Sequence, residues 1–310
     1  MRTPSRARNG LIIPFALITA GTLLLTACGS GADDTATASA ESDAVPTADV
    51  VSAIGKDEAA ARLLPPGTKT LTLAVSVSGQ PPGTSILDDG KTLAGQDVDF
   101  ANAVAKVLGI RLRTEQASFE AILPALDSGK YDLGVGNFGV TDERRRTIDF
   151  VTYINDGQGF ATRADSKLTK VTDLTQLCGL NVATGAGTTF EATLEDNKHL
   201  CDKPYKVQTY NEQGAIWSSL QQGRSDVVMS TINGLRYAVA HQQGVKFLNE
   251  YHRLDVGFAF KKGTPLTKAF QTAVNDLIED GTYARILKKW GTTGSAISTS
   301  RISPPEGKNS

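Results

Sequence analysis

The chain has 310 residues, of which 40% are hydrophobic, 32 are Lys or Arg and 33 are Asp or Glu. This length and apolar content suffice for two domains of ordinary size or for one large one. The formal net charge of -1 gives no strong positive field, which argues against a nucleic-acid-binding protein. With 30 Gly and only 6% aromatic residues, the composition favours an α/β protein over a coiled coil or a disordered chain.

The chain begins with a targeting segment. Arg2, Arg6 and Arg8 precede an apolar run at residues 11–25, which is the layout of a secretory signal peptide. The run is shorter than the roughly 20 residues of a membrane span. It ends in Leu-Thr-Ala-Cys at Cys28, which resembles the lipobox of bacterial lipoproteins, although a chance cysteine is the alternative. We expect cleavage before Cys28 and lipidation of its thiol, which would hold the protein on the outer face of the cell membrane.

A polar segment separates Cys28 from the folded body. Residues 29–66 are rich in Ala, Ser, Thr, Gly and Asp, and the first basic residue among them is Lys56. Such a composition cannot bury enough apolar surface to offset the entropy of ordering. We therefore expect a solvated linker over residues 28–66 and a domain that starts near Thr68.

Strand and helix patterns alternate along the body. Buried strands are predicted at residues 71–77, 112–116 and 131–135, and helices at 98–108 and 119–126. This order is typical of a βαβαβ unit with a parallel sheet. A similar series then follows, with strands at 180–183, 205–209 and 226–229 and helices at 189–197 and 213–221.

The last part of the body returns to the first unit. A strand is predicted at residues 256–261 and a long helical stretch at 265–290, interrupted at Gly281. If this stretch closes the first unit, the chain crosses between the two units twice. The sequence thus predicts an α/β protein of two lobes, with parallel-rich sheets and helices on both faces.

Two cysteines lie in the second unit. Cys178 and Cys201 are separated by 22 residues in a chain assigned to an oxidising exterior, which favours a disulfide between them. Two buried free thiols are the alternative. His199 adds only one further ligand, so a zinc site is not expected, and the sequence indicates no other metal or cofactor site.

Short motifs in a fixed order carry a family resemblance. They are Gly-Gln-Asp-Val-Asp at 95–99, Phe-Glu-Ala-Ile-Leu-Pro-Ala-Leu at 119–126, Thr-Asp-Glu-Arg at 141–144, Gly-Thr-Thr at 187–189, Leu-Gln-Gln-Gly-Arg-Ser-Asp at 220–226 and Gly-Thr-Tyr to Lys-Trp-Gly at 281–291. With these motifs the chain resembles the extracellular solute-binding proteins of ABC importers, in particular the family for polar amino acids.

The resemblance implies a type II periplasmic-binding-protein-like fold whose two lobes close on a small carboxylate ligand. It divides the chain into a signal peptide (1–27), a linker (28–66), a first lobe (67–156 and 255–291), a second lobe (157–254) and a polar tail (292–310). We expect the tail to be disordered. The partners implied are an amino acid or related carboxylate and an ABC permease with its ATPase; the membrane is contacted through the lipid anchor only. A monomer is expected.

The resemblance also implies a site for the ligand carboxylate. The residue that matches Arg144 grips this group in the family, and a planar guanidinium suits it because two N–H groups can bind both oxygens. Thr188 and Thr189 precede a predicted helix, whose first amides can point at an anion. Phe119 matches a position that packs against the ligand. On the residues alone, Arg144 would be a surface charge, the two threonines a helix cap and Phe119 a core residue.

Several pocket positions of the family differ here. Gly139 stands where a hydroxyl residue is usual, and Asn137 replaces a small or hydroxyl residue. The Asp that pairs with the ligand ammonium in the family aligns with Thr231. A buried ammonium without a carboxylate costs several kcal/mol, so either another acid serves or the ligand has no such amine. The residues considered as replacements are Asp156 and Glu191 for the charge, Asn137 and Asn233 for hydrogen bonds, and Phe138 for the aromatic wall.

Two other function classes fit the same pattern. A sensory lipoprotein would bind a ligand in the same way and signal to a membrane partner. A dehydratase-like enzyme on this fold would need an acid catalyst in the cleft. The sequence contains no nucleophile motif, zinc-protease motif or phosphate-binding loop, and its three His residues lie in polar stretches, so we expect no catalytic residues.

Overall fold

The computed structural model describes residue 46 and residues 48–77 and 81–307. The expected signal peptide, Cys28 and the beginning of the expected linker lie outside the described residues. Residues 43–310 form one compact unit, to which all the described residues belong.

An eight-stranded sheet runs through this unit in the order β4-β1-β5-β10-β6-β9-β7-β8. The strands are β1 (Thr70–Ser76), β4 (Arg111–Ala117), β5 (Leu133–Val135), β6 (Ile148–Arg163), β7 (Asn181–Gly185), β8 (Lys206–Tyr210), β9 (Val227–Thr231) and β10 (Val245–Lys261). β1 pairs in parallel with β4 and β5, and β7 pairs in parallel with β8 and β9. β6 and β10 lie between these two parallel groups and pair with each other in antiparallel fashion.

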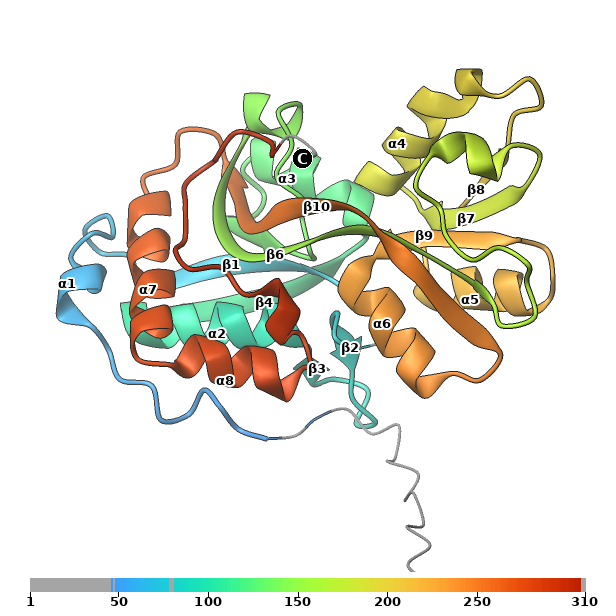
Figure 1. Cartoon of the computed structure of the whole chain (residues 1–310). Helices are drawn as coiled ribbons and strands as arrows, with labels where there is room; N and C mark the ends of the chain where they lie inside the picture. The colour runs from blue at the N-terminus through green and yellow to red at the C-terminus, as the bar shows by residue number, and fades with distance from the viewer. Residues whose placement is uncertain (1–45, 47, 78–80, 308–310) are drawn as a thin grey trace, which may run out of the picture. The chain divides into compact units, whose positions relative to one another are not determined.

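We call the parallel group of β4, β1 and β5 with its helices the first lobe, and the group of β9, β7 and β8 with its helices the second lobe. The helices of the first lobe are α1 (Glu58–Ala61), α2 (Gln96–Leu108), α3 (Phe119–Asp127), α7 (Thr267–Glu279) and α8 (Thr282–Lys289). Those of the second are α4 (Thr189–Asn197), α5 (Gln213–Gln221) and α6 (Ile232–His241). In the first lobe α2, α7 and α8 cover one face of the sheet and α3 the other (Figure 1). The predicted α/β architecture of two lobes is confirmed.

Short elements complete the fold. They are the hairpin of β2 (Ser85–Ile86) and β3 (Leu93–Ala94), and the 3-10 turns η1 (Arg144–Arg146), η2 (Leu174–Leu177), η3 (Lys198–Leu200) and η4 (Thr293–Ser295).

β6 and β10 join the two lobes. The two predicted crossings, at the lobe boundaries after residues 156 and 254, fall inside these strands, where Asp156 pairs with Leu254. At Gly157 a side chain is excluded, because a Cβ would lie 2.2 Å from the carbonyl oxygen of His252 and φ is +137°. The chain thus passes between the lobes as a close two-stranded ribbon.

The core is divided between the lobes and the faces of the sheet. In the first lobe Phe100 of α2 packs with Tyr153 and Tyr283, while Ile122 and Leu126 of α3 fill the other face. In the second lobe one cluster surrounds Phe160 and Tyr205 and another surrounds Trp217 and Leu235. Because each lobe has its own buried side chains, each can keep its structure when the ribbon between them bends.

The expected disulfide between Cys178 and Cys201 is confirmed. It joins the residue after η2 to the residue after η3, with 5.5 Å between the two Cα atoms. The bridged segment contains β7 and α4, including Thr188 and Thr189.

The end of the expected linker is part of the folded body, which corrects the boundary at residue 66. Ala60 of α1 is fully buried in the first-lobe core, and Ile54 and Leu64 pack against that core. The Asp57 N–H donates to the Val107 carbonyl oxygen at 2.8 Å, and the Asp57 carboxylate accepts from the first amides of α1. The alanine-rich sequence looked unable to bury surface, but a single small residue here fills a space between helices.

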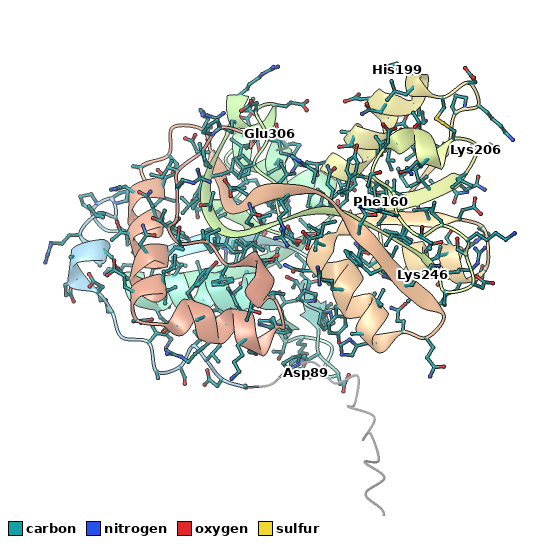
Figure 2. All side chains as sticks on the ribbon, viewed as in Figure 1. Asp89, Phe160, His199, Lys206, Lys246 and Glu306 are labelled. Carbon is teal, nitrogen blue, oxygen red and sulfur yellow. A yellow bond between two sulfur atoms is a disulfide. The ribbon has the colours of Figure 1, made fainter. Side chains whose placement is uncertain are left out.

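The tail is also ordered up to residue 307, which corrects the expectation of disorder. It runs back along β6, where Ile302 bridges Val151 and the Ser303 N–H donates to the Phe150 carbonyl oxygen at 2.9 Å. Arg301 forms an ion pair with Asp255 of β10 at 2.5 Å. Figure 2 labels Glu306 at the end of this segment. Polar groups of the tail thus form hydrogen bonds with Phe150 and Thr152 of β6.

Candidate functional site

A pocket lies where the strands of both lobes end. Its wall includes Ser76 at the end of β1, Gly185 at the end of β7 and Thr231 at the end of β9. Phe119 and Thr189, the first residues of α3 and α4, face it from opposite lobes. It contains about 1020 Å³ of empty space, including open solvent. Ligands of open α/β sheets bind at this position, beyond the carboxyl ends of the strands.

Arg144 spans the pocket from the first lobe to the second. Its Nη1 donates to the Gly139 carbonyl oxygen at 3.2 Å, and its Nη2 donates to the Gly187 carbonyl oxygen at 3.3 Å. Its guanidinium carbon lies 5.8 Å from the centre of the Phe119 ring. Among the described residues no carboxylate is within ion-pair distance of this guanidinium. The half-buried cation therefore faces the pocket with carbonyl oxygens as its direct partners.

Burial lowers the pKa of Arg144 to about 10, although the charges of Glu143 and Glu306 act in the opposite direction. The guanidinium thus remains a cation at neutral pH, in surroundings that hydrate it poorly. A carboxylate in the pocket would supply the missing opposite charge.

Thr188 and Thr189 begin α4 on the other side of the pocket. The Thr188 hydroxyl caps this helix, because it accepts from the Glu191 N–H at 3.3 Å and donates to the Gly185 carbonyl oxygen at 2.7 Å. The Glu191 carboxylate accepts from the Gly187 N–H at 2.7 Å. The side chains of Thr188 and Glu191 thus both cap the N-terminus of α4, and Glu191 is not on the pocket wall. The first backbone N–H groups of a helix have no acceptor within it, so Thr189 can offer its amide.

Two phenylalanines form one wall. The rings of Phe119 and Phe138 are stacked, with 4.8 Å between their centres. Phe119 lines the pocket, whereas Phe138 is fully buried behind it and does not. Phe138 therefore supports the wall from behind and does not form it.

The remaining expected residues are divided between the wall and its support. Asn137, Gly139 and Thr231 line the pocket, and the Thr231 hydroxyl accepts from the Gly234 N–H at 3.1 Å to cap α6. A Cβ at Gly139 would lie 3.2 Å from a methyl of Leu254, which leaves little room for the hydroxyl residue of the family. Asn233 is buried away from the pocket.

Asn137 connects the pocket to the ribbon between the lobes. Its Nδ2 donates to the Asp156 carboxylate at 2.8 Å, and its backbone N–H lowers the pKa of the Asp97 carboxyl. Its φ of +58° is unusual for a residue other than glycine and places both groups on buried acids. Burial raises the pKa of Asp156 and that of Asp97 to about 6 each.

Asp97 is a pocket residue that the sequence reasoning did not assign. It is 3% exposed, lines the pocket and accepts from the Tyr153 hydroxyl at 2.6 Å. In the sequence it reads as an ordinary acid in the first turn of a helix. Its place in the Gly-Gln-Asp-Val-Asp motif was the available signal.

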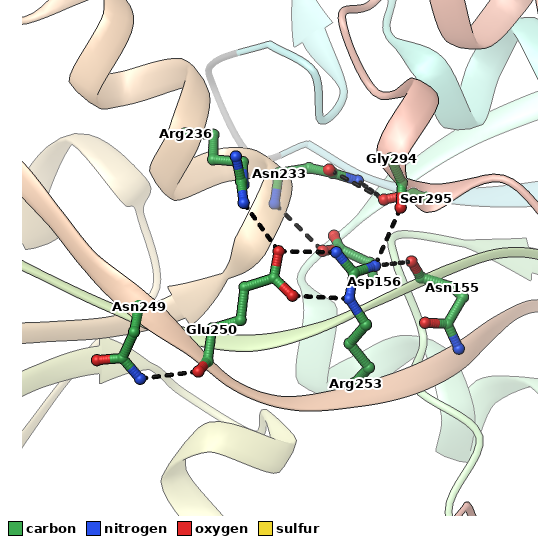
Figure 3. A network of polar contacts seen from close by, with 9 residues as sticks. All are labelled: Asn155, Asp156, Asn233, Arg236, Asn249, Glu250, Arg253, Gly294 and Ser295. Atoms are coloured by element: carbon green, nitrogen blue, oxygen red, sulfur yellow. Dashed lines mark hydrogen bonds and ion pairs between the residues drawn. The ribbon is translucent and has the colours of Figure 1, made fainter. Parts of the chain in front are cut away.

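A polar network holds the ribbon on the side of Asp156 (Figure 3). The Asp156 carboxylate accepts from the Asn233 N–H at 3.1 Å, and the Asn233 side chain exchanges two hydrogen bonds with the Ser295 hydroxyl. Arg253 pairs with Glu250 at 2.8 Å and also donates to the Gly294 carbonyl oxygen at 3.2 Å. Residues of the second lobe are thereby joined to η4, which follows α8 of the first lobe.

Metal ligands are not clustered in the part of the chain that the structure describes. There, no three His, Cys, Asp or Glu side chains are grouped so that they could hold a metal ion. Nor does any helix among those residues combine the length and the apolar character that a membrane crossing requires.

Comparison with known proteins identifies the fold and the family. The L-cystine-binding protein TcyJ of Escherichia coli K12 is 29% identical over 224 residues, which are 71% of this chain and 82% of the relative. An ancestral arginine-binding protein, solved with arginine bound, is 30% identical with a TM-score of 0.65 and covers 71% of this chain and 97% of its own.

A third likeness bears on catalysis. An ancestral amino acid-binding protein described as a precursor of cyclohexadienyl dehydratase is 26% identical, with a TM-score of 0.63 and coverage of 71% and 95% of the two chains.

Residues 73–293 match the model of the bacterial extracellular solute-binding proteins, family 3. With its two lobes, its pocket at the strand ends and this match, the chain belongs to the bacterial extracellular solute-binding proteins of family 3.

Proposed function

We propose that the chain is the substrate-binding lipoprotein of an ABC transporter, which captures a polar amino acid or a related small carboxylate and delivers it to a membrane permease. The observation that carries this proposal is the Arg144 guanidinium, which lies on the pocket wall without an ion-pair partner among the described residues. It faces the start of α4 across the pocket. A cation from one lobe and helix amides from the other form a binding site for one carboxylate.

The ligand acts as a bridge between the lobes. Arg144 and the Thr189 amide bind its carboxylate, and Phe119 packs against its carbon chain. Thr188, Asn137, Gly139 and Thr231 form the adjacent wall, while Phe138 and Asn233 support it from behind. The lobes close by bending of the ribbon of β6 and β10, and the closed state is favoured because only there does the ligand contact both lobes.

The charges on the pocket wall favour an amino acid over a simple carboxylate. Among the described residues of the wall, the charged ones are one cation, Arg144, and three acids, Asp97, Glu120 and Glu212. A ligand with a carboxylate and at least one cationic group matches this mixture. Relatives that bind cystine and arginine are consistent with such a ligand.

The setting of the protein follows from its N-terminal motif and its family. Lipidation at Cys28 would anchor it to the outer face of the cell membrane, with a linker that ends near residue 50. The first lobe then comprises residues 50–156 and 255–307, and the second comprises residues 157–254. We expect a monomer that meets the permease and its ATPase only when it carries ligand.

Two other functions remain as alternatives. A sensing lipoprotein would bind the same ligand, but loss of the gene would leave uptake of that ligand by cells unchanged. A dehydratase-like enzyme would convert the bound carboxylate, and the likeness to a dehydratase precursor keeps this alternative open. Sustained formation of product from the stabilising ligand would identify it.

A thermal-shift screen of the purified protein tests the proposal. The compounds are L-cystine, L-arginine, L-histidine and L-glutamine, with succinate and glycine betaine as carboxylates without a primary amine. A ligand at 100 times its dissociation constant stabilises a protein by about 2.7 kcal/mol, which shifts the unfolding temperature visibly. Stabilisation by an amino acid supports the proposal. If none of these compounds shifts the transition, amino-acid capture is wrong.

A further inference from the structure

Asp97 has an environment that a purely structural acid does not need. It lies in the first turn of α2, is 3% exposed and is on the pocket wall. Its carboxylate accepts from the Tyr153 hydroxyl at 2.6 Å, and the backbone N–H of Asn137 lowers its pKa. Both donors are neutral, so they satisfy hydrogen bonds without balancing the charge.

The charge of Asp97 lacks a cation among the described residues. Asp99, two residues later in the same turn, pairs with Lys289 at 2.7 Å and accepts from Trp290 Nε1 at 2.8 Å. Asp156, the other buried acid, is influenced by Arg253. For Asp97 no such partner is present among the described side chains. The neighbouring charge of Asp156 is of the same sign, and the start of α2 offers only the partial charge of a helix end.

The position of Asp97 relative to Arg144 fits the two charges of an α-amino acid. The backbone N–H of Asn137 acts on the Asp97 carboxylate and lowers its pKa, and Arg144 is hydrogen-bonded to the backbone of Gly139. These two residues are two positions apart on one loop, so their Cα atoms are separated by at most about 7 Å. An α-carboxylate and an α-ammonium are attached to one carbon atom and therefore need an acid and a base that are close together.

We propose that Asp97 accepts the α-ammonium of the ligand. This inference rests on the proposed function. Asp97 would then replace the acid that the family has at the position of Thr231, whose hydroxyl caps α6. Ligand binding then places one cation beside Asp97 and one anion beside Arg144 in the same step.

Paired ligands and paired variants test this role. Each amino acid is measured beside the same compound without its α-amino group: L-arginine with 5-guanidinopentanoate, L-cystine with 3,3′-dithiodipropionate, L-glutamine with 4-carbamoylbutanoate and L-histidine with imidazole-4-propionate. Isothermal titration calorimetry on the wild-type protein selects the pair with the tightest-binding member. Asp97→Asn keeps the shape and an acceptor for Tyr153 but removes the charge, and Asp99→Asn removes a charge from the same turn away from the pocket.

We expect Asp97→Asn to lower the affinity for the amino acid by at least about tenfold and to change that for its amine-free partner by less than about threefold. Asp99→Asn should change neither affinity. The inference is overturned if Asp97→Asn lowers both affinities equally or leaves the amino acid unaffected. It is also overturned if the wild-type protein binds the amine-free partner more tightly, in which case carboxylate capture by Arg144 stands. If no compound of the four pairs binds, the proposed function itself fails.

A measurement on the wild-type protein covers the case in which Asp97→Asn does not fold. Titrations near pH 6 in buffers with different heats of ionisation report the protons released on binding. Pairing with an ammonium stabilises the ionised carboxylate, so the amino acid should release more protons than its amine-free partner. Equal release by both compounds contradicts the inference.

Discussion

The guanidinium of Arg144 reaches across the pocket to the carbonyl oxygen of Gly187, with 3.3 Å between Nη2 and the oxygen. Arg144 belongs to the first lobe, and Gly187 lies in the turn between β7 and α4 of the second. The same guanidinium therefore serves as the proposed carboxylate receptor and as a direct contact between the lobes. A ligand carboxylate would compete with a neutral carbonyl for one of its N–H groups.

Arg144→Ala should abolish most carboxylate binding while the protein stays folded. Loss of a charge-assisted pair costs about 1.5–3 kcal/mol, which is roughly a 10- to 150-fold loss of affinity. Calorimetry with the stabilising ligand measures it. Arg146→Ala, which alters an exposed residue of the same turn, should bind normally. Affinity of Arg144→Ala within about threefold of wild type would contradict the role of this residue.

Loss of the disulfide should destabilise the second lobe. Cys178 and Cys201 are 23 positions apart, and closing a loop of this length stabilises a fold by about 3 kcal/mol in the chain-entropy treatment. The double variant Cys178→Ser with Cys201→Ser should therefore unfold at lower temperature or denaturant concentration. A reducing agent should lower the wild-type transition and leave the double variant unchanged. An equal response of both proteins would show that the bridge is not formed in solution.

The segment before β1 should contribute to stability through Ala60. Ala60→Glu places a charge in the first-lobe core, where an unpaired ion costs several kcal/mol. Ala59→Glu, at the exposed preceding position of the same short helix, should have little effect. Denaturant unfolding of the two variants provides the comparison. Similar midpoints would mean that α1 does not dock on the first lobe.

The C-terminal segment should also stabilise the body. A chain that ends at Ser298 loses the contacts of Ser300, Arg301 and Ser303 with β6 and β10. Net contributions of about 1 kcal/mol for each of a few hydrogen bonds, less the entropy of ordering, give a loss of about 2 kcal/mol. A chain that ends at Gly307 retains all these contacts and is the control. An unchanged midpoint for the shorter chain would contradict a docked tail.

Asp156 should make the stability depend on pH in a defined direction. Its pKa is raised by burial from 3.8 to about 6, so the folded state binds the proton more tightly than the unfolded state. Its contribution to stability is therefore present below about pH 4 and is lost as the pH rises to about 6. Across this window the free energy of unfolding of wild type minus that of Asp156→Asn should fall by about 3 kcal/mol.

Denaturant unfolding at several pH values measures this difference. Asp202→Asn, at an exposed position, is the control, and its difference from wild type should stay constant across the window. A constant difference for Asp156→Asn as well would show that the carboxylate is not held in a poorly hydrated environment.

The regular elements with local signals were predictable from the sequence. The bounds of α4 and α5 were predicted as observed, because a polar start and apolar spacing define each of them. Most of β6 was not predicted. Its apolar residues are interrupted by a polar stretch around Asp156 and Gly157, which forms a strand only because β10 pairs with it. α6 was missed because it starts directly after β9 without a loop.

The pocket was predictable only in part for similar reasons. Motif order identified Arg144, Thr189 and Phe119, which all line it. Alignment gave no information on depth, so Phe138 and Asn233 were expected at the ligand although they lie behind the wall. Asp97 was overlooked because its exposure to the pocket depends on Asn137 and Tyr153, which are distant in sequence.

Because residues 50–64 dock on the first lobe, they also determine which lobe receives a force that is applied to the preceding chain. The ordered chain enters through α1 beside α2 and α7, and it makes these contacts with the first-lobe core. Any pull transmitted along the preceding segment is thus received by the first lobe. The second lobe is connected to the first through the ribbon, the contacts of η4 and the hydrogen bond from Arg144 to Gly187, so bending of the ribbon would move the second lobe relative to the half that receives the pull.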